Sequence, residues 1–193
     1  MNKRLSISLA AFVGWLLITV VGGRMHTGEA PLLQSVTRGL GWPFLLALVV
    51  RQQWRDVGLN QLTTRRSLLL TWLPMLYIGV GLGLAVVFGL PPLGVLLWIL
   101  FNTFLVGLSE ELMFRGVLLQ AFRRTVSIWP AVALTTLAFG AIHEHWVLGT
   151  LAGAVFAFAR LRRGRLSDAV LAHAVANAVV AAAALSGRWG LWG

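Results

Sequence analysis

The sequence predicts an all-α fold, a polytopic transmembrane helical bundle of about seven spans around a buried polar site. Hydrophobic residues make up 58% of the 193 residues and charged residues only 11%. Uncharged runs at 5–23 and 67–99 match or exceed the roughly 20 residues that cross a bilayer as helix. The polar site is predicted from the adjacent acids Glu110 and Glu111, which lie in apolar sequence where each ionisable group costs about 2.5–3.5 kcal/mol.

The limits of the predicted spans follow from breaks in the apolar sequence. The first span follows Lys3 and Arg4, lacks a small-residue cleavage site and leads into more apolar sequence, so we interpret it as an anchor and not a signal peptide. Pro91 and Pro92 separate the third span from the fourth, because proline cannot continue the helical hydrogen-bond ladder. The fifth and sixth spans are short for a full crossing. The predicted spans are residues 5–21, 31–50, 67–88, 93–122, 128–142, 147–160 and 167–185.

The basic residues orient this bundle, which we expect to be one integrated membrane domain. In an alternating model, thirteen of the 16 basic residues fall on one side, and Arg24, Arg38 and Arg188 fall on the other. Basic loops stay in the cytoplasm, which predicts a cytoplasmic N-terminus and an external C-terminus. The preference for arginine over lysine suggests a GC-rich bacterial source, so we expect an integral protein of the inner membrane.

The composition argues against several other classes. The net charge of +10 is distributed over short loops and not along one soluble face, so we expect no nucleic-acid partner. With no cysteine, the chain has no disulfide, thiol nucleophile or thiolate metal ligand. We expect the tryptophans to lie in belts at the two membrane interfaces. They include Trp15, Trp42, Trp54, Trp98, Trp129 and Trp146.

Polar residues in three of the spans are expected to meet. If the fourth and fifth spans form a hairpin that turns near 123–127, Glu110 and His143 each lie roughly 20 Å from the turn and face each other. His173 and Asn177 lie four apart on one helix face. His173 would be only about 9–12 Å from its own loop, so a tilted fourth span or a re-entrant fifth span is needed to bring all of them together.

Shorter patterns are open to simple structural interpretations. Glu111 and Arg115 are four apart, which predicts a structural ion pair. The sequence His143-Glu144-His145 does not form a zinc-binding helix pattern, because histidines two apart point to nearly opposite sides of a helix. We expect Glu144 and His145 to be loop residues, either of which could touch a substrate or a metal. Gly149 and Gly153, followed by Ala157, form a small-residue stripe suited to close helix contact.

Three motifs in order carry a resemblance to a known family. Glu110-Glu111 with Arg115, Phe139 with His143, and His173 with Asn177 resemble the CAAX-protease and bacteriocin-processing (CPBP) family of intramembrane proteases. The resemblance implies that residues 93–185 are a catalytic helical core, preceded by N-terminal transmembrane spans at 1–92. It further implies an endopeptidase in which Glu110 and His143 activate water and His173 and Asn177 help stabilise the oxyanion. Glu111 and Arg115 would then hold the first motif in place, and Phe139 would serve in packing.

The chemistry of these residue types agrees with the implied reaction. A carboxylate and an imidazole can share the protons of an attacking water, and amide and imidazole donors suit a developing oxyanion. We predict no tightly bound metal, because Asn177 would be a poor fourth zinc ligand; a zinc site, if formed, would use Glu110, His143 and His173. Predicted partners are the lipid bilayer and a peptide or protein cut near a membrane segment or at its C-terminus. Prenylated CAAX tails, leader peptides and C-terminal sorting signals remain open as substrates.

Two other functions also fit buried ionisable residues. A proton-coupled transporter could use glutamate and histidine as a relay, although the sequence lacks the inverted repeat common in transporters. A non-catalytic membrane scaffold would not need these residue types together. Isolated polar side chains between membrane helices are also used simply as packing donors, so each histidine and Asn177 has this structural alternative.

Overall fold

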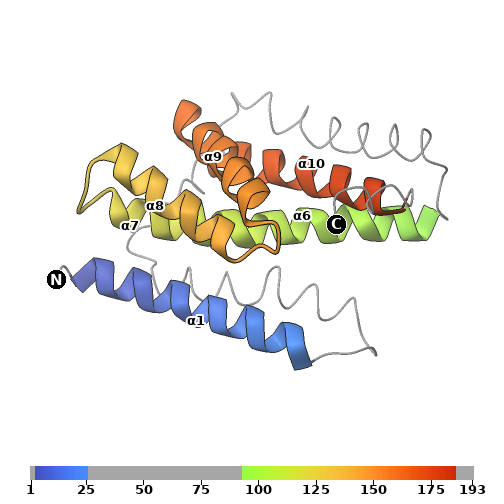
Figure 1. Cartoon of the computed structure of the whole chain (residues 1–193), viewed down its shortest axis with the longest axis horizontal. Coiled ribbons are helices and arrows are strands. Elements are labelled where there is room, and N and C mark those ends of the chain that lie inside the picture. Colours follow the sequence, from blue (N-terminus) through green and yellow to red (C-terminus); the bar gives the residue numbers. More distant parts are fainter. Residues whose placement is uncertain (1–2, 26–92, 186–193) are drawn as a thin grey trace.

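The computed structural model describes residues 3–25 and 93–185, and every regular element in these two segments is helical (Figure 1). This confirms the all-α prediction for the described residues. The predicted spans at 31–50 and 67–88 lie outside them, so the count of seven stays a prediction. The helices are α1 (Lys3–Met25), α6 (Leu93–Glu111), the π-helix η4 (Leu112–Leu118), α7 (Leu119–Phe122), α8 (Ile128–Ala141), α9 (Trp146–Arg163) and α10 (Leu166–Leu185).

A continuous rod of α6, η4 and α7 forms the centre of the described structure (Figure 1). It begins directly after Pro91 and Pro92, as the break in the apolar sequence predicted. Within the described residues, one stretch of this rod, Leu97–Phe122, is long and apolar enough by length and composition to cross a membrane. The π-helical turns follow immediately after Glu111, and every η4 side chain is buried. Such widened turns are rare and are found frequently at functional sites.

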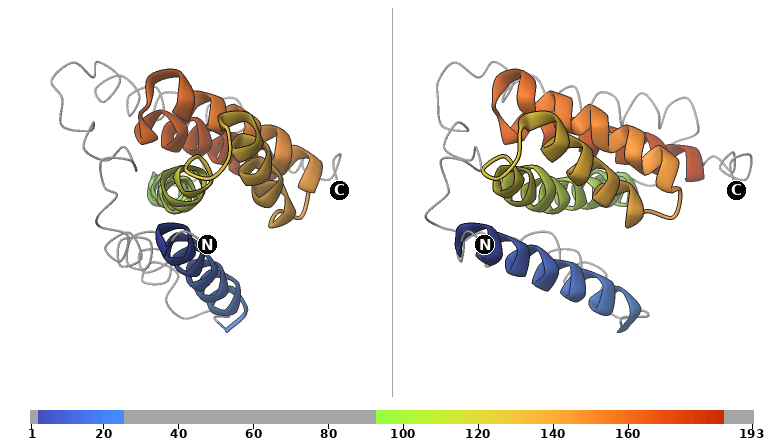
Figure 2. Two further views of the ribbon diagram at one scale, coloured as in Figure 1. Left: turned by 90° about the vertical axis from the view of Figure 1, so that its left-hand side faces the viewer. Right: turned by 60° about the vertical axis from the view of Figure 1, so that its left-hand side comes forward.

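The remaining helices pack around the rod on two sides. After the rod, the chain reverses between Phe122 and Ile128, where the sequence predicted a turn. Helix α8 packs on α9, and α10 packs on both α6 and α9, whereas α1 contacts η4 from the opposite side of the rod (Figure 2). Helix α9 ends at Arg163 and is followed by Gly164, whose φ of 71° is a left-handed conformation that glycine adopts without a Cβ penalty.

Trp15 of α1 corrects one sequence prediction. Its side chain is 1% exposed and packs edge-on against Phe114, at 5.8 Å between ring centroids. Its indole Nε1 donates a hydrogen bond to Ser109 Oγ at 3.1 Å. Trp15 is therefore a core residue that attaches α1 to the rod, not a member of an interfacial belt. The indole needs a partner for its N–H when buried, and Ser109 supplies it. Trp129 and Trp146, in contrast, are 73% and 63% exposed.

Candidate active site

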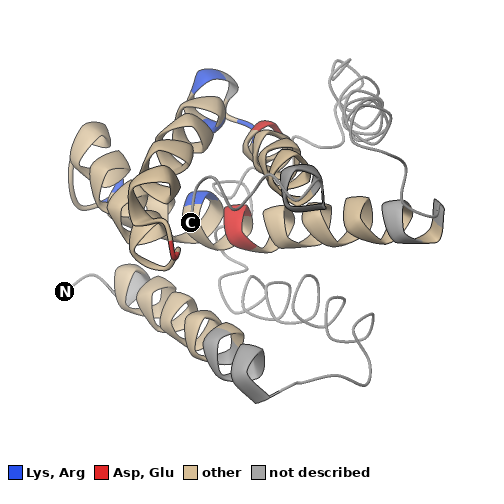
Figure 3. Cartoon of the chain, turned by 45° about the vertical axis from the view of Figure 1, so that its right-hand side comes forward, with Lys and Arg blue, Asp and Glu red and all other residues tan. Residues whose placement is uncertain are grey.

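Glu111, the last residue of α6, connects the rod to α10. Its fully buried Oε1 accepts a hydrogen bond from Arg115 Nη1 at 3.0 Å, which is the ion pair predicted from their spacing. The same oxygen lies 2.9 Å from Nδ1 of His173, whose side chain is only 3% exposed. Figure 3 shows the resulting acidic band on the rod beside a basic one, in a surrounding of uncharged ribbon. One carboxylate oxygen therefore holds both a guanidinium and an imidazole.

Arg115 extends this contact to α9. Its Nη2 donates a hydrogen bond to the backbone carbonyl of Gly153 at 2.6 Å. The guanidinium also lies over the ring of Phe139, 4.4 Å from its centroid, in a cation–π arrangement. A fully buried arginine is stable only when its charge and its N–H groups find partners. Arg115 finds partners for its charge and for both Nη atoms in Glu111, Gly153 and Phe139, while its buried Nε has no hydrogen-bond partner among the described residues.

The carboxylate of Glu110 faces the Nε2 atoms of two histidines, and not the atoms that Glu111 contacts. Its Oε2 lies 3.7 Å from His143 Nε2 and 3.9 Å from His173 Nε2. The Glu110 side chain is 17% exposed and that of His143 is 33% exposed, so this part of the site is more open than the region around Glu111. The contact between Glu110 and His143 predicted from the hairpin is present, and His173 reaches the same carboxylate. Helix α8 has only 14 residues, consistent with the predicted short fifth span.

The hydrogen bonds fix which ring nitrogen of each histidine faces Glu110. Nδ1 of His143 lies 2.7 Å from the carbonyl oxygen of Phe139, which can only accept a hydrogen bond. Nδ1 of His173 lies against Glu111, which also accepts from Arg115. Both Nδ1 atoms must therefore carry a proton, and both Nε2 atoms are directed to Glu110.

Aromatic rings hold the two imidazoles in place. Phe139 is 1% exposed, with its ring centroid 4.4 Å from that of His143 and 5.5 Å from that of His173. Phe156 stacks on His173 at 4.6 Å with an interplanar angle of 12°. These contacts restrict rotation of both rings, which keeps their Nε2 atoms directed to one point.

Two glycines of α9 allow the close packing that the site requires. A Cβ added at Gly149 would meet His143 Cβ at 3.0 Å, and one at Gly153 would meet Arg115 Nη2 at 3.1 Å. Both distances are shorter than ordinary van der Waals contact. The small-residue stripe predicted from the sequence therefore lies directly against two candidate site residues.

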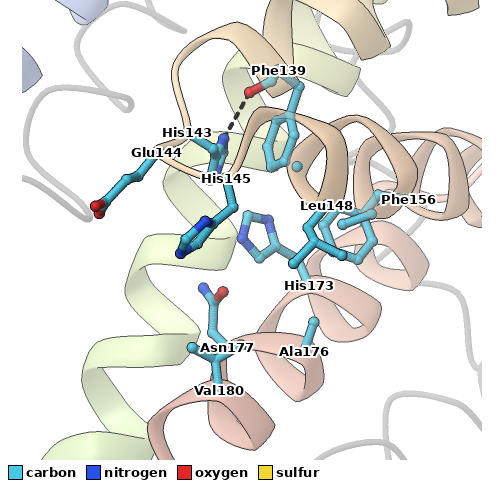
Figure 4. Close-up of a pocket in the computed structure, with 12 residues that line it drawn as sticks. Phe139, His143, Glu144, His145, Leu148, Phe156, His173, Ala176, Asn177 and Val180 are labelled. Carbon is cyan, nitrogen blue, oxygen red and sulfur yellow. Dashed lines mark hydrogen bonds between the residues drawn. The ribbon is translucent and has the colours of Figure 1, made fainter. Parts of the chain in front are cut away.

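A pocket of about 260 Å³ opens beside the histidines, between the start of α9 and the face of α10. Within it, the side-chain amide of Asn177 points toward the rings of His145 and His173, whereas the carboxylate of Glu144 points away from them (Figure 4). Glu144 and His145 lie in the loop between α8 and α9, as expected. The rest of the lining is mainly apolar: Phe139, Leu148, Gly149, Ala152, Phe156, Ala176 and Val180, with His143 at the edge.

Residues 92–179 match the family model of the type II CAAX prenyl endopeptidases, Rce1-like. This segment is an Rce1-like domain. The match is consistent with the predicted CPBP resemblance, and it identifies the segment with a membrane-embedded family of CAAX proteases. The six predicted site residues, Glu110, Glu111, Arg115, His143, His173 and Asn177, all lie inside the matched segment. Neither a curated protein nor a solved structure matches the chain.

Three side chains of the Rce1-like domain are candidates for a metal centre. Glu110, His143 and His173 offer the right atoms for zinc, two imidazole nitrogens and a carboxylate oxygen. Within the described residues, however, no three His, Asp or Glu side chains converge as the ligands of a metal ion would. The absence of a tightly bound metal therefore stays a prediction, and the chemistry below is written for the side chains alone.

Sequence reasoning missed two features of the Rce1-like domain. The first is the carbonyl of Gly153, which holds Arg115 but leaves no side-chain signal in the sequence. The second is the apolar wall of the pocket, whose residues resemble any others in an apolar helix. The small-residue stripe was the one available signal for the first, because only a residue without a Cβ admits the guanidinium so near the backbone.

Proposed function

We propose that this chain is an intramembrane endopeptidase in which Glu110 and His143 activate a water molecule for attack on a peptide bond. The Rce1-like domain supports a CAAX-type protease. One observation carries the mechanism: Glu110 Oε2 and His143 Nε2 face each other at 3.7 Å while His143 Nδ1 is committed to the Phe139 carbonyl. An ionised Glu110 and a neutral His143 then present two acceptors at one point.

Water suits this pair because it can donate a hydrogen bond to each acceptor and keep its oxygen free to attack. In the proposed step the water oxygen bonds to the carbonyl carbon, and one water proton passes to the Glu110 carboxylate. The carbonyl π electrons move to oxygen and create an oxyanion. When the C–N bond breaks, the protonated Glu110 returns its proton to the departing amine. The reaction consumes one water and leaves Glu110 ionised again.

The oxyanion needs hydrogen-bond donors directed at the carbonyl oxygen while the water attacks the carbonyl carbon. His173 and Asn177 lie one helical turn apart on α10, and both line the pocket beside His143. Loss of one such donor costs about 10²–10³ in kcat in well-studied hydrolases. We propose His173 and Asn177 as these donors, with Glu111 and Arg115 holding His173 and the end of α6 in place.

We further propose that the substrate is a peptide cut near a membrane-associated segment or at its C-terminus. The apolar wall of the pocket, including Leu148 and Val180, supports this assignment because it offers contacts to apolar side chains near the cleaved bond. We also propose that the protein lies in the bacterial inner membrane, with its N-terminus in the cytoplasm.

The test compares peptides in membranes from cells that produce wild type, Glu110→Gln or Asp168→Asn. The Asp168 variant removes a carboxylate from the first turn of α10 as a matched control. Mass spectrometry should find new peptide termini with wild type and Asp168→Asn, and none with Glu110→Gln. Identical termini in all three samples would exclude a protease that uses Glu110, and a transporter or scaffold would then be the better interpretation.

A further inference from the structure

Arginines gather at one end of the Rce1-like domain, outside the candidate active site. Arg160 lies in the last turn of α9, beyond the residues of that helix that line the pocket. The charges that act on its guanidinium are Arg123, at the end of α7, and Asp168, in the first turn of α10. The turn between α7 and α8 and the turn between α9 and α10 therefore lie together (Figure 3).

The side chains at this end, which we call the basic end, carry an excess of positive charge. Asp168 is the one acid among its described residues. Arg160 is only 5% exposed, so water screens the repulsion between it and Arg123 weakly. An anion bound to the exposed guanidinium groups would lower this repulsion. The arginines of the basic end are Arg123, Arg124, Arg160, Arg162 and Arg165.

The turn between α7 and α8 presents its arginines in a defined position. The backbone N–H groups of Thr125 and Val126 both donate to the Phe122 carbonyl, at 2.8 and 2.9 Å. The Nη1 of Arg123 donates to Gln120 Oε1 at 3.3 Å. Because the turn and this side chain are already ordered, an anion that binds here pays little of the usual entropic cost of fixing an arginine.

Exposed apolar side chains lie beside these arginines. Trp129 is 73% exposed and Val126 is 40% exposed. An accessible indole next to basic residues is typical of the level at which lipid headgroups meet the acyl chains. The positive-inside rule assigns both turns to the cytoplasmic leaflet, where basic sites at the ends of membrane helices bind anionic headgroups. A phospholipid thus matches both the charged and the apolar part of this surface.

We propose that the basic end is a binding site for the phosphodiester headgroup of an anionic phospholipid, such as phosphatidylglycerol. Arg123 and Arg162 are exposed and donate to the phosphate oxygens, to which a guanidinium is well fitted. The buried Arg160 adds to the positive potential without touching the lipid. Trp129 lies against the start of the acyl chains. The site is separate from the proposed peptidase chemistry and uses none of its residues.

The experiment measures lipid binding to the purified full-length protein in a neutral detergent. Native mass spectrometry counts bound lipids after titration with phosphatidylglycerol or with zwitterionic phosphatidylcholine of the same acyl chains. Thermal unfolding of the same samples reports stabilisation, because a ligand of the folded state raises the melting temperature. We expect phosphatidylglycerol to bind at least about tenfold more tightly and to raise the melting temperature. Equal binding of the two lipids would overturn the proposal.

Two double variants locate the site. Arg123→Gln with Arg162→Gln removes two exposed guanidinium groups and should weaken phosphatidylglycerol binding by about tenfold or more. Arg24→Gln with Arg38→Gln lowers the net charge equally on the predicted opposite side of the membrane, and should leave the affinity unchanged. Wild-type affinity in the first variant, or equal losses in both, would show that the lipid does not bind at the basic end.

A single substitution serves if the first double variant does not fold. Arg162→Gln changes one exposed side chain near the end of α9 and should weaken binding by about fivefold. Wild-type affinity in this folded variant would overturn the proposal.

Inorganic phosphate distinguishes a lipid headgroup from a free anion. It offers no acyl chains to Trp129, so we expect it to leave the melting temperature unchanged at the concentrations at which the lipid raises it. An equal rise with inorganic phosphate, without selective binding of phosphatidylglycerol, would identify a phosphate site and overturn the assignment to lipid. Peptide cleavage plays no part in these measurements, so failure of the proposed peptidase function would leave their result standing.

Discussion

Trp15 and Ser109 join the first helix of the chain to the residue immediately before the two glutamates, through a hydrogen bond of 3.1 Å from the indole Nε1 to the hydroxyl oxygen. Ser109 is 6% exposed and Trp15 is 1% exposed, so water does not replace the bond if it is lost. Trp15 and Ser109 are ninety-four positions apart in the sequence, and their contact helps to fix the location of the neighbouring Glu110.

Trp15→Phe should therefore affect both stability and catalysis. The substitution keeps an aromatic ring next to Phe12 and Phe114 but removes the N–H and part of the indole volume. We expect a loss of about 1–3 kcal/mol in unfolding free energy from the lost hydrogen bond and the cavity. Thermal unfolding in detergent measures it. Leu17→Ala, at a position that is 59% exposed on the same helix, is the control and should change little.

Glu110→Gln should abolish cleavage in a protein that remains folded. The amide is nearly isosteric with the carboxylate, but it cannot take a proton from water, so the loss falls on the chemical step. We expect kcat to fall by about 10²-fold or more, with a melting temperature close to that of wild type. Turnover and melting are measured on the same preparations. A variant with wild-type turnover would show that Glu110 is not the base.

Arg115→Ala should lower the yield of folded protein as well as activity. Removing the guanidinium leaves Glu111 fully buried without its cationic partner, a change of about 3–5 kcal/mol for buried ion pairs. The Gly153 carbonyl loses its donor at the same time. Arg115→Lys keeps the charge but cannot bond to both partners with one planar group, so its stability should lie between those of Ala and wild type. Equal stability of Arg115→Ala and wild type would contradict a structural role for the pair.

Activity should survive treatment with metal chelators. In the proposed reaction Glu110 and His143 activate the water directly, and no cation is required. Turnover of the purified protein after dialysis against a chelator, with metal content measured in parallel, tests this. Stoichiometric zinc, with activity lost on chelation and restored by zinc, would show that the water is activated by metal.

Reporter fusions test the predicted orientation. Thirteen of the 16 basic residues fall on one predicted side, so the N-terminus and residues 52–66 and 160–165 should be cytoplasmic. Pro91, Pro92 and the C-terminus should then be external. A C-terminal phosphatase fusion should be active and a C-terminal green fluorescent fusion dark. The opposite result would mean that the number of spans is even.

The sequence predicted the site better than its surroundings, for physical reasons. Five of the site residues are ionisable groups in an apolar chain, and each must find a partner. Few arrangements give all of them partners, so the sequence could predict that they lie together. These residues are Glu110, Glu111, Arg115, His143 and His173. Helical spacing alone predicted the pair of Glu111 and Arg115. The burial of Trp15 did not follow, because tryptophan is suited both to membrane interfaces and to cores, and only the partner decides.

Backbone features were beyond sequence reasoning. The acceptor for Arg115 is a carbonyl, which every residue has, so nothing in the letters marks Gly153 as its partner. The π-helical turns at Leu112–Leu118 are built from residues that would fit an ordinary helix. Hydropathy and spacing do not distinguish the two, because the choice depends on packing against α1 and α10.

The π-helical segment sets the angular phase between the two ends of the rod. A π turn holds more residues than the 3.6 of an α turn, so the glutamates before it and the residues of α7 after it are rotated relative to their places in a regular helix. If Leu112–Leu118 wound as a regular α-helix instead, one end of the rod would turn against the other, and Glu110 and Glu111 would change direction relative to α7. The winding of this segment therefore matters as much as its composition.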